Sequence, residues 1–150
     1  MPIVYFDTSA LVRRYHPAEP GSSRVRALCR RTSGNVLTTA YLTPPEVASA
    51  FSRKLREGSI SREQQRRGWR LFNRHRRDQY HVLALYDQIC RRAEDLLFAH
   101  TLRAYDALQL ATALQAARLL GALADFSFCT ADRAQAVAAT AEGLQVELIS

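Results

Sequence analysis

Short apolar segments alternate with amphipathic segments along almost the whole chain. The apolar runs have the length and the β-branched or aromatic content of buried strands, and they cover 3–6, 36–39, 80–85, 126–129 and 144–149. The segments between them predict helices over 8–15, 22–31, 43–57, 61–77, 87–100, 102–120 (closed by Gly121) and 131–140. Strands that alternate with helices in this way are typical of an α/β domain with a mostly parallel sheet.

Proline and hydroxyl residues mark the start of two of these predicted helices. Pro44 and Pro45 suit the first turn of a helix, where the missing backbone N–H has no partner to lose. Glu46 is placed to complete a capping box there, and this role alone would account for it. Ser61 and Gln64 have the spacing of a second capping box.

The length and the cysteine content set broad limits. The 150 residues suit one domain over 1–150, and no repeat or linker divides them. No apolar run approaches the roughly 18 residues of a membrane span, and the first residues lack the pattern of a signal peptide. Three widely separated cysteines fit neither a disulfide framework nor a zinc site. We therefore expect a cytoplasmic protein with no membrane segment.

Charge narrows the choice of partners. The chain has 21 basic and 14 acidic residues, a formal net charge of +7, and Lys54 as its one lysine. Arginine pairs with phosphates through two donors at once and stacks on bases, so this composition favours RNA or DNA as a partner. It would also keep a small domain soluble, and charge alone does not separate the two interpretations.

One predicted helix concentrates this charge. At about 100° per residue, the helix over 61–77 places five arginines on one side, opposite a packed side that holds Leu71 and Phe72. The row consists of Arg62, Arg66, Arg70, Arg74 and Arg77. A solvated helix face is the usual explanation of a charge run. Because this run has one sign and repels itself, we expect it to bind the phosphates of a substrate.

Two aspartates directly follow predicted core strands. Asp7 comes after the strand over 3–6, and Asp132 follows the strand over 126–129. The carboxyl ends of parallel strands are where open α/β sheets bind their ligands. Each aspartate could instead cap the next helix, and Asp132 with Gln135 has the spacing of a capping box.

Asp106 lies in a segment that is apolar on almost every side, as buried helices are. On a helix it points the same way as Leu102 and Leu110. A lone carboxylate there would lose its hydration unless a cation or hydrogen-bond donors replaced it. A functional site would supply such a partner, and so would a salt bridge to a nearby arginine such as Arg103.

Three carboxylates at one edge of a sheet would repel one another, so one must protonate or a divalent cation must neutralise them. Oxygen ligands without neighbouring Cys or His favour Mg²⁺ or Mn²⁺ over zinc. Such an ion suits the attack of water on a phosphodiester. The residues therefore predict a metal-dependent nuclease built on Asp7, Asp106 and Asp132.

With these residues in place, the chain resembles the PIN-domain ribonucleases, and within them the VapC-type toxins of toxin–antitoxin pairs. Four segments carry the resemblance in the family's order, namely 4–12 with Asp7 and Ser9, 45–50 with Glu46, 103–111 with Asp106, and 130–133 with Asp132. The two prolines before Glu46 are the one mild departure from the family's pattern.

The resemblance implies a three-layer α/β/α fold around a short, mostly parallel sheet. It also implies a Mg²⁺- or Mn²⁺-dependent endoribonuclease that cuts RNA, forms a homodimer and has a cognate antitoxin encoded beside it. The implied metal ligands are Asp7, Asp106 and Asp132. Glu46 would bind the metal or position water, and Ser9 and Thr130 would hydrogen-bond the acids.

Two other classes of function remain open. One is a non-catalytic RNA- or protein-binding module on the same fold, which would have no affinity for a metal. The other is a phosphotransfer domain that uses Asp7 covalently, although Ser9 stands where such domains usually have a second acid. The sequence has neither a recognisable nucleophile elbow nor a glycine-rich phosphate loop.

Overall fold

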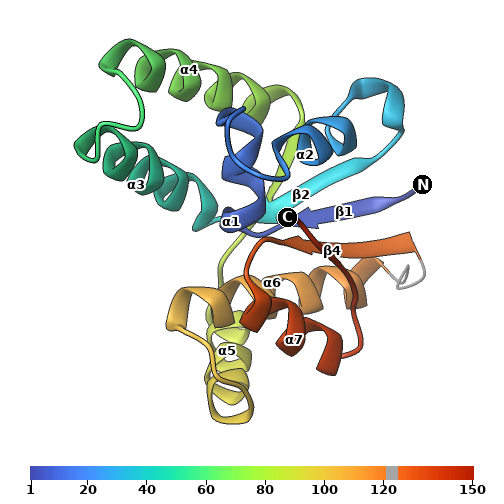
Figure 1. Cartoon of the computed structure of the whole chain (residues 1–150). Helices are drawn as coiled ribbons and strands as arrows, with labels where there is room; N and C mark the ends of the chain where they lie inside the picture. The colour runs from blue at the N-terminus through green and yellow to red at the C-terminus, as the bar shows by residue number, and fades with distance from the viewer. Residues whose placement is uncertain (121–124) are drawn as a thin grey trace.

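One parallel sheet organises the molecule (Figure 1). The structure is a computed structural model, and it describes residues 1–120 and 125–150. Within these residues the strands are β1 (Ile3–Phe6), β2 (Val36–Ala40), β3 (Tyr80–Leu83), β4 (Phe126–Thr130) and β5 (Gln145–Leu148). They lie in the order β3-β2-β1-β4-β5, and every described strand pair is parallel. The predicted α/β fold with a parallel sheet is confirmed.

Helices cover both faces of the sheet, which gives the predicted three layers (Figure 1). One layer contains α1 (Thr8–Leu11), α2 (Ser22–Leu28), α3 (Thr43–Arg56) and α4 (Arg62–Asp78). The other contains α5 (Asp87–Ala99), α6 (Ala104–Leu120) and α7 (Arg133–Ala141). Over the two described stretches of chain, no helix has the length and apolar character of a membrane span.

The central strand β1 connects two hydrophobic cores. All four of its residues are buried, because helices cover both faces of a parallel sheet. Alternate side chains of a strand point to opposite faces. Tyr5 therefore stacks on Phe128 in the core beside α6, whereas Phe6 packs in the other core with Phe51. This packing fixes the end of β1, from which the chain enters the candidate site.

Most predicted element bounds agree with the structure to within a few residues. The helix predicted over 8–15 is α-helical only to Leu11 and continues as a 3₁₀ turn, η1 (Val12–Tyr15). A second 3₁₀ turn, η2 (Arg31–Ser33), follows α2. The strand predicted over 80–85 ends at Leu83, where its pairing with β2 ends. Gly121, expected to end α6, lies outside the described residues.

One of the two predicted capping boxes at 43–46 and 61–64 is present. Ser61 and Gln64 bond each other's backbone N–H groups at the start of α4, as expected. The capping role of Glu46 is wrong. α3 already begins at Thr43, its N-cap is Leu42, and no side chain caps it. Glu46 is therefore available for other contacts.

Candidate active site

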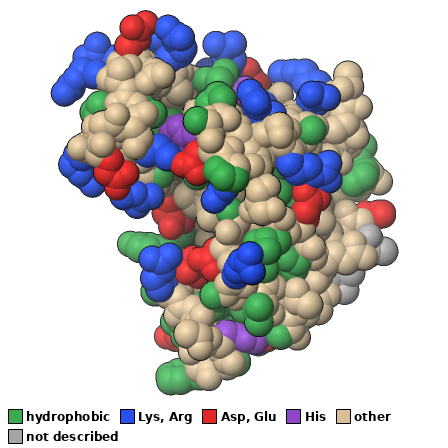
Figure 2. Space-filling view, in the orientation of Figure 1, with side chains coloured by type: hydrophobic (Ala, Val, Ile, Leu, Met, Phe, Trp, Pro, Cys, Tyr) green, Lys and Arg blue, Asp and Glu red, His purple; other side chains and the backbone are tan. Residues whose placement is uncertain are grey.

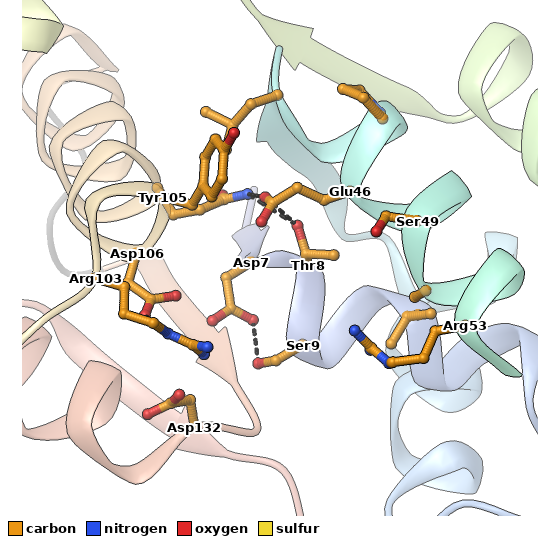
Figure 3. A pocket seen from close by; sticks show the side chains of 15 residues that line it. Asp7, Thr8, Ser9, Glu46, Ser49, Arg53, Arg103, Tyr105, Asp106 and Asp132 are labelled. Atoms are coloured by element: carbon orange, nitrogen blue, oxygen red, sulfur yellow. Dashed lines mark hydrogen bonds and ion pairs between the residues drawn. The ribbon is translucent and has the colours of Figure 1, made fainter. Parts of the chain in front are cut away.

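A cleft opens at the carboxyl end of β1. This strand has β2 on one side and β4 on the other, so the helices that follow β1 and β4 separate at this point. In open α/β sheets such a reversal of strand order leaves a crevice for ligands. The cleft has a volume of about 450 Å³, and its walls bring together all four predicted acids, Asp7, Glu46, Asp106 and Asp132 (Figure 3).

Asp7 is the most deeply buried of these acids, with 3% of its surface exposed. Its Oδ1 accepts hydrogen bonds from the Ser9 hydroxyl at 2.7 Å and from the Ala10 backbone N–H at 3.0 Å. Its Oδ2 accepts from the Thr130 hydroxyl at 2.5 Å. The bond from Ala10 is an N-cap of α1, so Asp7 does cap this helix. The bonds from Ser9 and Thr130 go beyond capping and fix both carboxylate oxygens toward the cleft.

Burial and neighbouring negative charge raise the pKa of two carboxyl groups of the cleft, those of Asp7 and Asp106. Burial raises the pKa of Asp7 to about 7; the charge of Asp106 adds to the rise, and the bonds from Thr130, Ser9 and Ala10 oppose it. Burial also raises the pKa of Asp106, with the charge of Asp132 in the same direction and Arg103 opposing. These acids therefore lie close enough to sense one another, and a perturbed cluster of this kind in a cleft is typical of a functional site.

Asp106 projects from the first turn of α6 and is half-buried. The guanidinium of Arg103 lies 3.5 Å from its Oδ2, so the ion pair considered in the sequence analysis is present. This pair is loose, because the Arg103 side chain is 86% exposed and solvent screens it. The positive charge of Arg103 can therefore move away from Asp106, and the side chain does not block the cleft.

Asp132 caps α7, since its Oδ1 accepts from the Gln135 backbone N–H at 3.1 Å. The second half of a capping box is absent. The Gln135 side chain donates instead to the backbone carbonyl of Asp106 at 2.8 Å, and the Asp132 N–H donates to Thr130 Oγ1 at 3.1 Å. Gln135 thus ties the start of α7 to the start of α6 and holds their two aspartates at the same cleft.

Glu46 belongs to a polar network that crosses from α3 to α6. Its Oε1 accepts from the Thr8 hydroxyl at 2.7 Å and from the Gln109 side-chain amide at 3.0 Å. The same amide lies 2.9 Å from Thr43 Oγ1, and Gln109 Oε1 accepts from the Tyr5 hydroxyl at 2.7 Å. Sequence reasoning missed Gln109, although it is a polar residue in the same apolar segment that drew attention to Asp106.

Sequence reasoning also missed Arg53, and it considered Arg103 only as an ion-pair partner of Asp106. Arg53 of α3 and Arg103 before α6 line opposite walls, and their guanidinium groups point toward the acids (Figure 3). The predicted substrate-binding residues lie elsewhere, on the exposed face of α4, and none of Arg62, Arg66, Arg70 and Arg74 lines the cleft. Figure 2 shows basic side chains gathered over the layer that contains α3 and α4.

The donor set of the cleft suits a hard cation. Its walls offer carboxylate, hydroxyl and amide oxygens and neither His nor Cys. Across the described residues, no three acidic, His or Cys side chains stand close enough to hold one ion together. Mg²⁺ usually takes only one or two protein carboxylates and keeps several waters. The residues therefore fit Mg²⁺ or Mn²⁺ with water in the remaining positions.

A comparison with known protein families identifies the family of this chain. The sequence model of the PIN domain matches residues 4–139, which include all four acids. The chain belongs to the PIN domain family. The resemblance to PIN domains that was found in four segments of the sequence is thus confirmed.

Solved structures similar to this PIN domain are distant in sequence. A chain of VapBC2 from Rickettsia felis, solved bound to a DNA fragment from their promoter, is 12% identical, with a TM-score of 0.61 over 99% of both chains. A chain of FitAcB from Neisseria gonorrhoeae is 15% identical, with a TM-score of 0.59 over 95% of each chain. PAE2754 from Pyrobaculum aerophilum is 15% identical, with a TM-score of 0.55 over 97% of this chain and 90% of that one. No curated protein sequence matches.

Proposed function

We propose that this PIN domain is a Mg²⁺- or Mn²⁺-dependent endoribonuclease that acts as the toxin of a toxin–antitoxin pair. The observation that carries the proposal is the convergence of Asp7, Asp106 and Asp132 from three elements on one cleft. The negative charges of these carboxylates repel one another in the metal-free protein, and a bound cation would remove that repulsion. A chain with a net charge of +7 would also attract a polyanionic substrate.

The residues of the cleft have distinct roles in this proposal. Asp7, Asp106 and Asp132 would hold the metal, directly or through its bound waters, and the metal when bound activates water for attack on the phosphodiester and stabilises charge on the leaving oxygen. Ser9 and Thr130 keep the two oxygens of Asp7 in one orientation. Glu46 is fixed by hydrogen bonds from two other helices, so it is suited to orient the attacking water.

Basic residues would hold the RNA. Arg53 and Arg103 reach toward the acids from opposite walls of the cleft, so they are placed to bind phosphates on either side of the cleaved bond (Figure 3). The exposed arginines of α4 would contact the backbone further out. These contacts are needed because the acids of the cleft repel RNA.

The direct test is RNA cleavage by the purified protein. We expect total cellular RNA to be cut in Mn²⁺ or Mg²⁺ and to remain intact in EDTA, with no phospho-enzyme formed. Sequencing the new ends would then identify the RNA and the cleavage site. A protein that binds RNA in either condition and cuts it in neither would instead be a binding module.

The toxin role is tested in cells. Expression of the chain should arrest growth, and Asp7→Asn should relieve the arrest. Co-expression of the small open reading frame next to the gene should relieve it too. An inhibitor could insert an Arg or Lys into the acidic cleft and replace the charge of the metal. Harmless overexpression of a folded protein that cuts RNA in vitro would contradict the toxin role and leave the nuclease role standing.

The proposed assembly is a homodimer that binds its cognate antitoxin. Light scattering of the purified protein should give twice the mass of one chain. A monomer that retains nuclease activity would rule out the dimer alone.

A further inference from the structure

A second concave region lies between α2 and α4. Two hollows of about 670 and 480 Å³ adjoin there, and they share Arg14, Arg26 and Leu71 in their walls. Together they form one depression, named here the α2–α4 groove. Its walls have no residue in common with the acidic cleft. The groove is therefore a separate feature of the same helical layer.

The groove is strongly basic. Its cationic side chains are Arg14, Arg26, Arg30, Arg31, Lys54 and Arg67. Its one acid, Glu19, is bonded to Lys54. Arg26, Arg30 and Arg31 form no side-chain hydrogen bond or ion pair with any described residue. Several positive charges thus face the groove without compensation.

The arginines converge from separate elements. Arg14 lies on η1, Arg31 on η2 and Arg74 on α4. His75 also lines the groove, and its pKa is lowered to about 4. Burial is the largest cause, and the positive charges of Arg14, Arg74 and Arg31 lower the pKa further. Because Arg74 also belongs to the exposed row of α4, the basic surface continues from the groove onto that row.

Hydrogen bonds to neutral groups fix the floor of the groove. Arg14 donates to the Tyr80 hydroxyl at 2.7 Å, and this hydroxyl lies 2.5 Å from that of Tyr15. The Tyr15 hydroxyl lies 2.8 Å from His75 Nδ1. The network positions Arg14 and leaves its charge uncompensated. His16, only 6% exposed, also lines the groove, and its Nε2 has no partner among the described residues.

We propose that the α2–α4 groove binds the phosphate backbone of the RNA substrate at a distance from the cleaved bond. This inference rests on the proposed ribonuclease function. The cleft repels a polyanion, so most of the affinity must come from positive charge elsewhere, and a concave arginine surface concentrates that charge. RNA has a charge at every nucleotide and can meet arginines spread over several elements, whereas an acidic peptide would need a matching run of carboxylates.

The test measures binding separately from cleavage. All proteins contain Asp106→Asn, and a fluorescent single-stranded RNA is titrated in EDTA at several salt concentrations. The groove variant is Arg26→Gln with Arg30→Gln, both exposed positions of or next to α2. The control is Arg56→Gln with Arg118→Gln, which removes the same charge from exposed positions outside the groove. Circular dichroism confirms that each protein is folded.

We expect the groove variant to bind RNA about 10-fold more weakly or worse near physiological salt, and its salt slope to fall by about 1.5 to 2. The control should stay within about 2-fold of the parent. Equal binding by the two variants would overturn the proposal. A groove variant that loses affinity for polyglutamate and keeps its affinity for RNA would assign the groove to an acidic protein.

Cleavage assays separate this proposal from the proposed function. With Asp106 restored, a groove variant that cuts RNA with an unchanged KM would refute the groove and support the nuclease. A parent protein that binds RNA through the groove and cuts none in Mn²⁺ would support the groove and refute the nuclease.

Discussion

The acidic cleft and the α2–α4 groove are two hollows with opposite charge and opposite construction. In the cleft, short hydrogen bonds fix Asp7 and Glu46 in one position each. In the groove, Arg26 and Arg30 are exposed side chains with no partner among the described residues. Chemistry on one bond needs groups held in fixed geometry, whereas a flexible polyanion is held by many adjustable charges. Changes in the cleft should therefore alter turnover, and changes around the groove should alter affinity.

The largest effect is expected from Asp106→Asn. It removes a charged group from the cleft with little change in volume, so RNA cleavage should fall by more than about 100-fold while RNA binding in EDTA stays within about 2-fold. The control is Asp87→Asn, which breaks an exposed pair with Arg91 at 2.7 Å on a neighbouring helix. Gel assays and anisotropy measure the two properties. Near-normal cleavage by the Asp106 variant would remove this residue from the site.

Asp7→Asn should abolish cleavage and yet stabilise the metal-free protein. Burial raises the pKa of Asp7 from 3.8 to about 7. Its contribution to stability is thus complete below pH 3.8 and is lost as the pH rises through 7. Asparagine stays neutral, so in EDTA the variant should melt several degrees higher than the parent at pH 8, with a smaller difference at pH 5. An equal or lower melting temperature at pH 8 would show that the Asp7 charge is well accommodated.

Gln109→Leu should weaken both stability and turnover. The substitution keeps roughly the same volume but leaves the Tyr5 hydroxyl without its partner and the Glu46 carboxylate with the Thr8 hydroxyl alone, which destabilises the fold by about 2–3 kcal/mol. Because Glu46 is then less well held, kcat should fall about 10-fold with KM little changed. Gln115→Leu, farther along α6 and outside the network, is the control for urea unfolding and kinetics. Parallel losses in both variants would point to a general effect on α6.

The smallest effect is expected from the exposed row on α4. Replacing Arg66 and Arg70 by Gln should weaken RNA binding about 2- to 3-fold, lower the salt slope by about 1 or less and spare metal binding. The row is convex and hydrated, unlike the groove beside it. If the affinity for RNA falls as far as it does in the groove variant, the main RNA contact lies on the exposed face of α4 and not in the groove.

The sequence predicted those parts of the site that depend on local pattern. Asp7 and Asp132 were found because each follows a buried strand, and Asp106 because it interrupts an apolar helix. Whether a capping aspartate also faces a cleft could not be decided locally, since Asp7 and Asp132 each cap a helix and also line the cleft.

The remainder depends on contacts between distant segments. Local pattern alone explained Glu46 as a cap, and only the family resemblance predicted a role for it in the site. Its partners Thr8 and Gln109 are 38 and 63 residues away in the chain. Arg53 and the groove arginines looked like ordinary surface charge, because the residues next to them in the sequence do not indicate which hollow they line. Only the packing of α2, α3 and α4 reveals that.

The side-chain amide of Gln109 also links the two helical layers by hydrogen bonds. It starts from α6 on one face of the sheet and bonds Thr43 and Glu46 of α3 on the other, past the end of β1. Moving the layers apart would break both bonds, one buried and one part-buried, so a hinge-like opening of the cleft is opposed. Entry and exit are left to the rim, where Tyr105 and Arg103 are exposed and can move on the fast timescale of surface side chains. The frame of this protein should thus stay still while the rim gates access.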